Sequence, residues 1–248
     1  MPEPAAPATS ASPPPPRPLD EIETWVFDLD NTLYPASCRI FDQIHRRMGE
    51  FIAAHFGVGL DEAVRIRREL FLAHGTTLRG LMTEHGIAPQ AFMEYVHTLD
   101  LSAIARDHAL GTALAALPGR KVVFTNGSVR HAENILGHLG LDAHFSGIFD
   151  IEAAGYVPKP DPAGYDTLIR RFAIDPARAA MVEDMAKNLA PAAALGMTTV
   201  WVRGDADWAA EGADAPYVHH VVDDLAPFLT RIAGARRAAA AAATLPVR

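Results

Sequence analysis

Cysteine is almost absent from this chain, which has Cys38 as its single thiol among 248 residues. No intramolecular disulfide can form, as is usual for a protein kept in a reducing compartment, and we expect a cytoplasmic location. A reactive thiol is less favoured for Cys38 than an ordinary helix residue. The chain also lacks an apolar run of about 18 residues, so we expect no membrane span.

Positive charge is also scarce, because 22 Lys and Arg stand against 30 Asp and Glu, a formal net charge of −8. A nucleic-acid polymer is not an expected partner, since binding one needs clustered Lys and Arg. A small anion stays open as a ligand if one pocket collects positive charge. The 11 histidines show no HExxH spacing or similar metal pattern. The remaining composition, 49% hydrophobic and 21% charged, is typical of a globular protein with a sizeable core.

Both ends of the chain have a biased composition. Residues 1–20 are rich in Pro, Ala and Ser and contain a proline run at 13–16, which predicts a disordered tail. A partner that binds polyproline is the less favoured interpretation. No basic start precedes an apolar stretch, so a secretory signal is not expected. Residues 235–248 are rich in Ala and are interpreted as a second tail that extends a frayed helix.

Hydrophobic patterns between the tails predict alternating strands and helices. Short apolar and β-branched runs predict strands at 24–27, 121–124, 148–151, 180–182, 198–202 and 218–222. Helical patterns occupy 38–56, 61–73, 78–85, 89–98, 128–139, 163–172, 188–195 and 224–233. Strands that alternate with helices predict an α/β fold with a Rossmann-like parallel sheet covered on both faces. We expect this core over 21–35 and 109–234, with an inserted all-helical cap domain over 36–108.

The first predicted strand ends in two carboxylates, within Asp28-Leu29-Asp30-Asn31-Thr32. Ligands bind at the carboxyl ends of the strands in such a sheet. One carboxylate could attack phosphorus there while the other handles protons. The alternative is an acidic loop that caps a helix.

Three later segments carry polar groups near other strand ends. Thr125-Asn126-Gly127-Ser128 precedes a helix and could cradle phosphate, or simply provide an N-cap. Lys159 lies between two prolines that restrict the backbone, although a surface lysine is the alternative. Glu183-Asp184 follows a strand and offers the oxygen ligands that Mg²⁺ prefers, although it could be a solvated turn. Their shared placement favours one joint site.

Together, Asp28-x-Asp30-x-Thr32, Thr125, Lys159 and Glu183-Asp184 resemble the four ordered motifs of the haloacid dehalogenase superfamily. The resemblance spans residues 24–202. It implies the fold of that superfamily, and the helical insertion is similar to its C1 cap. Two segments look like the pyrimidine 5′-nucleotidase branch in particular: Asn31-Thr32-Leu33-Tyr34-Pro35 and His74-Gly75-Thr76-Thr77-Leu78-Arg79-Gly80-Leu81.

The resemblance implies a role for each matching residue. Asp28 would be the nucleophile and form an aspartyl-phosphate, while Asp30 would protonate the leaving alcohol and then activate water. Thr125 and Lys159 would hold the phosphoryl oxygens, with Asn126 and Gly127 beside them. A Mg²⁺ cofactor would be bound by Asp28, the backbone carbonyl of Asp30 and Asp184, helped by Glu183. Arg79 would contact a substrate oxygen and Tyr34 would line the pocket.

The expected partner is a small phosphorylated metabolite, a nucleoside monophosphate, and the expected assembly is a monomer or homodimer. A phosphatase for phosphoglycolate or a sugar phosphate is the first alternative. Pro35-Ala36-Ser37 stands where many such relatives have an acidic residue, which favours the nucleotidase. Asp30 argues against a dehalogenase, because halide departure needs no protonation. A phosphosugar mutase and a non-catalytic module that binds a phosphorylated ligand stay open.

Overall fold

A computed structural model of the chain describes residues 15–204 and 207–243. Its centre is a six-stranded sheet in which all neighbouring strands run parallel. In sheet order the strands are β3 (Ile148–Phe149), β2 (Arg120–Phe124), β1 (Thr24–Phe27), β4 (Ala179–Glu183), β5 (Thr198–Val202) and β6 (His220–Val222). The predicted α/β, Rossmann-like parallel sheet is confirmed.

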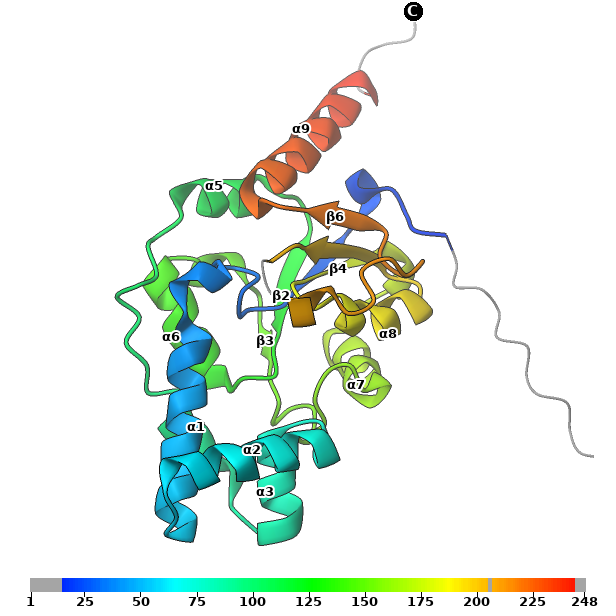
Figure 1. Cartoon of the computed structure of the whole chain (residues 1–248). Helices are drawn as coiled ribbons and strands as arrows, with labels where there is room; N and C mark the ends of the chain where they lie inside the picture. Colours follow the sequence, from blue (N-terminus) through cyan, green and yellow to red (C-terminus); the bar gives the residue numbers. More distant parts are fainter. Residues whose placement is uncertain (1–14, 205–206, 244–248) are drawn as a thin grey trace, which may run out of the picture.

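The described residues form nine α-helices around and beside this sheet (Figure 1). They are α1 (Ile40–Phe56), α2 (Leu60–His74), α3 (Thr77–His85), α4 (Pro89–Val96), α5 (His108–Ala116), α6 (Val129–Leu139), α7 (Pro162–Phe172), α8 (Leu189–Ala194) and α9 (Leu225–Ala243). The first four lie between β1 and β2 in the chain, without an intervening strand.

Alternating side chains of β1 divide the core into two layers. Trp25 and Phe27 are fully buried on the face covered by α5, α6 and α9, whereas Val26 packs on the opposite face with side chains of α7 and α8. Burying a large apolar side chain contributes about 1.5–3 kcal/mol. The two layers therefore hold β1 rigidly, and with it the residues that follow its carboxyl end.

Helix α1 connects the sheet to a separate cluster of apolar side chains. Ile44 packs in the core beside the sheet, whereas Ile52 packs with residues of α2, α3 and α4. Figure 1 shows α2 and α3 at the end of the molecule opposite α9. The limits of a cap domain at 36 and 108 stay a proposal, and Ile151 from the sheet side also joins this helical cluster.

Several predicted boundaries were wrong. Cys38 belongs to a short 3-10 helix, and α1 begins at Ile40 because Arg39 has left-handed backbone angles (φ 55°). Strand β3 ends at Phe149, where Asp150 accepts hydrogen bonds from two backbone N–H groups instead of continuing the strand. β6 begins at residue 220 rather than 218, and α5 was not predicted at all.

The predicted tails lie partly outside the described residues. Residues 1–14 and 244–248 are not described. In contrast, Leu19–Glu21 forms a 3-10 helix, and the Thr198 hydroxyl donates to the carbonyl of Arg17 at 3.0 Å. The alanine-rich segment continues α9 as far as Ala243. Within residues 15–204 and 207–243, we found no helix with the length and apolarity needed to cross a membrane.

Candidate active site

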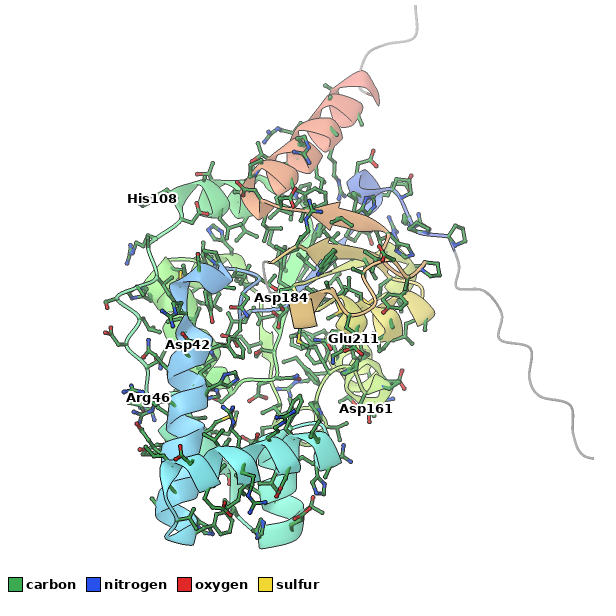
Figure 2. The ribbon with its side chains drawn as sticks, viewed as in Figure 1. Asp42, Arg46, His108, Asp161, Asp184 and Glu211 are labelled. Atoms are coloured by element: carbon green, nitrogen blue, oxygen red, sulfur yellow. The ribbon has the colours of Figure 1, made fainter. Side chains whose placement is uncertain are left out.

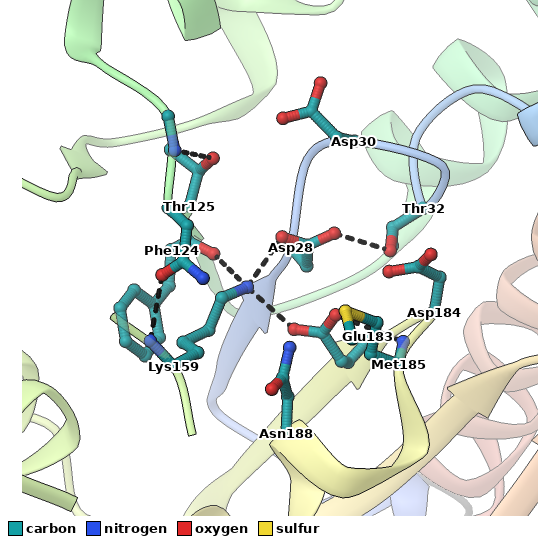
Figure 3. A network of polar contacts seen from close by, with 12 residues as sticks. Asp28, Asp30, Thr32, Phe124, Thr125, Lys159, Glu183, Asp184, Met185 and Asn188 are labelled. Atoms are coloured by element: carbon teal, nitrogen blue, oxygen red, sulfur yellow. Dashed lines mark hydrogen bonds and ion pairs between the residues drawn. The ribbon is translucent and has the colours of Figure 1, made fainter. Parts of the chain in front are cut away.

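The residues that follow β1, β2 and β4 meet at one edge of the sheet (Figure 3). β1 lies between β2 and β4, with Phe27 opposite Val123 and Val182. Asp28 is the next residue, and its backbone N–H donates to the carbonyl of Val182 at 2.9 Å. The parallel register therefore brings Asp28 beside the ends of both neighbouring strands. Figure 2 shows Asp184 in the middle of the molecule, whereas Asp42 and His108 lie along its outer side.

Lys159 joins three of these segments through its ammonium group. Nζ donates to Asp28 Oδ1 at 2.6 Å, to Glu183 Oε2 at 2.7 Å and to the carbonyl of Phe124 at 3.0 Å. The side chain is 2% exposed. Burial opposes the charge of this group, but the two carboxylates outweigh burial and raise the pKa of Lys159. Lys159 therefore stays charged and holds Asp28 and Glu183 together.

Three carboxylates surround this single ammonium group. Oxygens of Asp28, Glu183 and Asp184 lie within 4.8 Å of one another, and all three residues are buried. Burial and the nearby charge of Glu183 raise the pKa of Asp28 to about 7. Burial, Glu183 and Asp28 raise the pKa of Asp184 to about 10. The cluster thus holds more negative charge than Lys159 offsets, and a cation would stabilise its ionised form.

The donor set fits Mg²⁺ in kind. Oxygens are its preferred ligands, and it is usually held by one or two carboxylates plus water. Glu183 is already engaged through both oxygens, by Lys159 and by the backbone N–H of Met185 at 3.2 Å. Among the described residues, Asn188 Oδ1 is the buried side-chain oxygen that lacks a hydrogen-bond partner, and Figure 3 shows Asn188 next to this network.

The turn after β1 orients the acidic groups. Asn31 has left-handed backbone angles (φ 61°), and its side chain donates to Asp184 Oδ2 at 3.4 Å. The Thr32 hydroxyl donates to Asp28 Oδ2 at 2.9 Å. Because Lys159 takes the other oxygen, the Asp28 carboxylate has a fixed orientation.

Asp30 has a separate set of partners. Its Oδ1 accepts from the Tyr34 hydroxyl at 2.6 Å and lies 2.8 Å from Nε2 of His131. Burial opposes ionisation of Asp30, but His131 and the Tyr34 hydroxyl prevail and lower its pKa to about 2. Burial likewise opposes the charge of His131, but Asp30 outweighs it and raises the pKa of the imidazole. Asp30 is therefore an ionised carboxylate, while burial and Asp30 keep Tyr34 protonated by raising its pKa.

Residues of the loop after β2 border the site. Thr125 is buried, and its hydroxyl accepts the backbone N–H of Gly127 at 2.9 Å. Asn126 is exposed, and its side-chain oxygen accepts the backbone N–H of Lys159 at 2.9 Å. This contact fixes the Lys159 loop to the loop after β2, which explains how the two predicted segments come together.

One predicted site residue is not brought to this network. Arg79 is exposed on α3. Its backbone N–H donates at 3.1 Å to the hydroxyl of Thr76, the N-cap of this helix. The Arg79 side chain does not line the cavity of about 640 Å³ that lies beside α4 and the start of α6. That cavity is lined by side chains that include His97, Tyr156 and His131, and the last of these also contacts Asp30.

Sequence reasoning missed His131, His97 and Asn188. His131 lies in the first turn of α6, six positions after Thr125, so proximity to a strand-end motif was its available signal. Asn188 lies shortly after Glu183-Asp184, where the sequence pattern predicts only the start of a helix. His97 follows α4 and its ring stacks on that of His131, a contact that no local pattern predicts.

A doubly wound parallel sheet with a carboxylate–ammonium cluster at its carboxyl edge is typical of α/β enzymes. Comparison with family models identifies the particular family: residues 22–196 match the haloacid dehalogenase-like hydrolases, a hydrolase family. The chain belongs to this family, which confirms the resemblance noted from the four motifs.

Two curated proteins are each 26% identical to parts of this chain. Phosphate metabolism protein 8 of Saccharomyces cerevisiae (strain ATCC 204508 / S288c) is 26% identical over 201 residues, which cover 73% of this chain and 62% of that protein. The chain therefore spans less than two thirds of that relative. Enolase-phosphatase E1 of Acidiphilium cryptum (strain JF-5) is 26% identical over 220 residues, covering 78% of this chain and 90% of the relative.

Solved structures share the fold. A HAD phosphatase from Thermococcus onnurineus superimposes with a TM-score of 0.60 at 19% sequence identity, over 86% of this chain and 98% of the other. At this identity the likeness concerns the arrangement of strands and helices rather than the reaction.

Proposed function

We propose that this hydrolase is a Mg²⁺-dependent phosphomonoesterase that forms an aspartyl-phosphate on Asp28. The observation that carries the proposal is the buried cluster in which Lys159 contacts Asp28 and Glu183 while Asp184 lies within 4.8 Å. A carboxylate at a strand end, next to an ammonium group and a set of oxygen ligands, suits attack on an anionic phosphate ester. A curated relative that is named as a phosphatase supports the same reaction class.

In the first half of the reaction, a carboxylate oxygen of Asp28 attacks phosphorus and the bond from phosphorus to the ester oxygen breaks. Asp30 supplies a proton to the departing oxygen, which leaves as an alcohol. Lys159 stabilises the phosphoryl oxygens, together with the hydroxyl of Thr125 and backbone N–H groups of the loop after β2.

In the second half, water attacks the aspartyl-phosphate and Asp30 takes the proton of that water. Inorganic phosphate is released and the Asp28 carboxylate is regenerated. Burial opposes ionisation of Asp30, but His131 and the Tyr34 hydroxyl lower its pKa, so the ionised form that accepts this proton is favoured. The proton that Asp30 takes from this water is the one that it gives to the leaving alcohol of the next turnover, and its carboxylate must stay off the metal to exchange protons.

A bound Mg²⁺ would offset the charge repulsion between phosphate and carboxylate. Asp28, Asp184 and the backbone carbonyl of Asp30 would hold it. Glu183 would then act mainly through Lys159, because its two oxygens already accept hydrogen bonds from Lys159 and Met185.

We propose a nucleoside 5′-monophosphate, with a pyrimidine base, as the substrate. The segments 28–35 and 74–81 support this choice by their resemblance to the pyrimidine 5′-nucleotidase branch. The cavity of about 640 Å³ has room for a nucleoside, and its aromatic and amide lining (His97, Tyr156 and Asn134) suits a base and a ribose. Phosphoglycolate and sugar phosphates are the competing substrates.

The test is Mg²⁺-dependent release of phosphate from a panel of UMP, CMP, AMP, phosphoglycolate and glucose 6-phosphate, scored by kcat/KM. A preference for UMP and CMP is expected, and EDTA should abolish release. Asp28→Asn should lower kcat by at least about 10³-fold, since it removes the nucleophile. Asp42→Asn, an exposed acidic site on α1, should keep normal activity.

Three outcomes would each contradict a different part of the proposal. A profile led by phosphoglycolate or sugar phosphate would discard the nucleotide substrate and keep the reaction. Near-normal turnover by Asp28→Asn would discard the nucleophile assignment. Binding of UMP without any phosphate release would favour the non-catalytic module.

A further inference from the structure

The carboxylate of Asp30 is anchored through one oxygen. Oδ1 accepts from the Tyr34 hydroxyl at 2.6 Å and lies 2.8 Å from His131 Nε2, whereas Oδ2 has no hydrogen bond to any side chain or backbone group of the described residues. An ionised carboxylate only accepts hydrogen bonds, so Nε2 of His131 carries the proton of this contact. Two donors on one oxygen fix the plane of the carboxyl group and leave Oδ2 for exchange with substrate.

The ring of His131 is itself held on several sides. The side chain is 1% exposed. A Cβ atom at Gly127 would lie 2.9 Å from Cδ2 of the ring, so the absence of a side chain there makes room for it. The ring of His97 stacks on it, with centroids 4.3 Å apart and planes 17° from parallel.

Ser128 ties the two histidines to the same turn. Its hydroxyl oxygen accepts the backbone N–H of His131 at 3.2 Å and lies 3.2 Å from Nδ1 of His97. His97 follows α4, whereas His131 lies in α6. The helical segment between β1 and β2 therefore contacts the residue that holds Asp30.

We propose that His131 is a positioning residue for acid–base catalysis by Asp30, and that His97 braces its ring. This inference rests on the phosphatase reaction proposed above. Nε2–H of His131 holds Oδ1, so that Oδ2 is the oxygen that gives a proton to the leaving alcohol and takes one from water. Tyr34 alone would let the carboxyl group turn about its hydrogen bond, and small misplacements of a catalytic group are costly.

Esters with different leaving groups separate this role from a structural one. An alkyl phosphate needs a proton on its departing oxygen, whereas p-nitrophenolate leaves as a stable anion. Rapid-quench measurement of the first turnover with Mg²⁺ reports the rate of phosphoryl transfer to Asp28, separately from the later hydrolysis. His131→Ala should slow first turnover of the alkyl ester about 10- to 100-fold more than that of p-nitrophenyl phosphate. Equal slowing of both esters, or of neither, would overturn the inference.

Further variants guard against loss of folding. His131→Gln offers an amide N–H in place of Nε2 and should recover part of the alkyl-ester rate. In an Asp30→Asn background, His131→Ala should have little additional effect, because the two residues act through one contact. His108→Ala, at the exposed start of α5, is the matched control and should change neither ester. Additive effects of His131→Ala and Asp30→Asn would contradict a shared role.

His97→Ala should also slow first turnover of the alkyl ester more than that of p-nitrophenyl phosphate, by a smaller factor than His131→Ala. Proton NMR of the histidine rings gives a readout without turnover: a downfield imidazole N–H signal is expected in the wild-type chain and should vanish in Asp30→Asn. Absence of that signal would overturn the inference even in an active enzyme. No Mg²⁺-dependent release from either ester by the wild-type chain would instead overturn the proposed function, and the positioning role with it.

Discussion

At the scale of single residues, two lysines show how burial changes the effect on stability of losing one partner of an ion pair. Lys159 pairs with Glu183 at 2.7 Å with side chains 2% and 1% exposed, whereas Lys187 pairs with Glu211 at 2.8 Å with side chains 36% and 68% exposed. Removing one partner of a buried pair leaves an uncompensated charge, while an exposed pair is screened by water.

We therefore expect Lys159→Met to lower the free energy of unfolding by about 3 kcal/mol in EDTA. Lys187→Met should lower it by about 1 kcal/mol or less. Urea unfolding at neutral pH measures both. A similar loss in the two variants would mean that Asp28 and Glu183 do not depend on Lys159 for their charge balance.

Residue patterns predicted the strand-end groups but not their partners. Asp28, Thr125 and Asp184 each directly follow a strand, and a parallel register alone brings such positions together. His131 contacts Asp30 across 101 positions of the chain, from a helix rather than a strand end. Its position depends on how α6 packs on the sheet, which no local pattern encodes.

At the scale of elements, the turn between β2 and α6 needs a residue without a side chain. A Cβ atom at Gly127 would lie 2.9 Å from the His131 ring and 3.2 Å from the Thr125 hydroxyl oxygen. We expect Gly127→Ala to cost about 1–3 kcal/mol of stability through overpacking, and to slow alkyl esters more than p-nitrophenyl phosphate because the ring moves away from Asp30.

Gly137 provides the control on the same helix. It is exposed, and nothing lies within 4 Å of a Cβ atom added there. Gly137→Ala should raise the free energy of unfolding by up to about 1 kcal/mol through helix propensity, without changing the ratio of the two esters. A stable, fully active Gly127→Ala would show that the turn has room that its contacts do not suggest.

Elements with a one-sided apolar pattern were predicted best. α6 begins within a residue of its expected start because Ser128 caps it and its buried positions recur on one face. α5 was missed because its sequence, HALGTALAA, is apolar or small nearly all round and gives little contrast between faces. Its N-cap Asp107, which accepts the backbone N–H of Leu110 at 2.9 Å, was the signal that could have identified it.

At the scale of the whole molecule, the sheet order β3-β2-β1-β4-β5-β6 places β1 centrally. Helices between consecutive strands imply parallel pairing. The order of the strands depends on the side of β1 on which each later strand is added, and the sequence pattern does not specify that side. Burial of all four residues of β1 on both faces is the physical reason for the continuous apolar run Trp25–Phe27. Asp28, the next residue, is only 5% exposed, so burial opposes its charge and its ionisation affects the stability of the whole chain.

Metal and pH should therefore act together on global stability. Burial and Glu183 raise the pKa of Asp28 from 3.8 to about 7, and that of Asp184 is raised to about 10. Between pH 4 and 7 the metal-free folded chain keeps protons that the unfolded chain has released, so its stability falls as pH rises, by at most about 1.4 kcal/mol per pH unit for each carboxyl. Asp30, with a pKa lowered to about 2, is ionised in both states above about pH 5 and contributes a constant amount there.

At the proposed site, Mg²⁺ would bind the ionised carboxylates, so we expect the stabilisation by Mg²⁺ to grow as pH rises from about 5 to about 8. The difference in Tm between Mg²⁺ and EDTA at each pH measures this, and His131, whose raised pKa also weakens the folded state at higher pH, affects both conditions alike and largely cancels. In Asp184→Asn the difference should be small at every pH. A Tm difference that stays level with pH in the wild-type chain would mean that the cation binds away from Asp28 and Asp184, and that their charges are balanced by Lys159 alone.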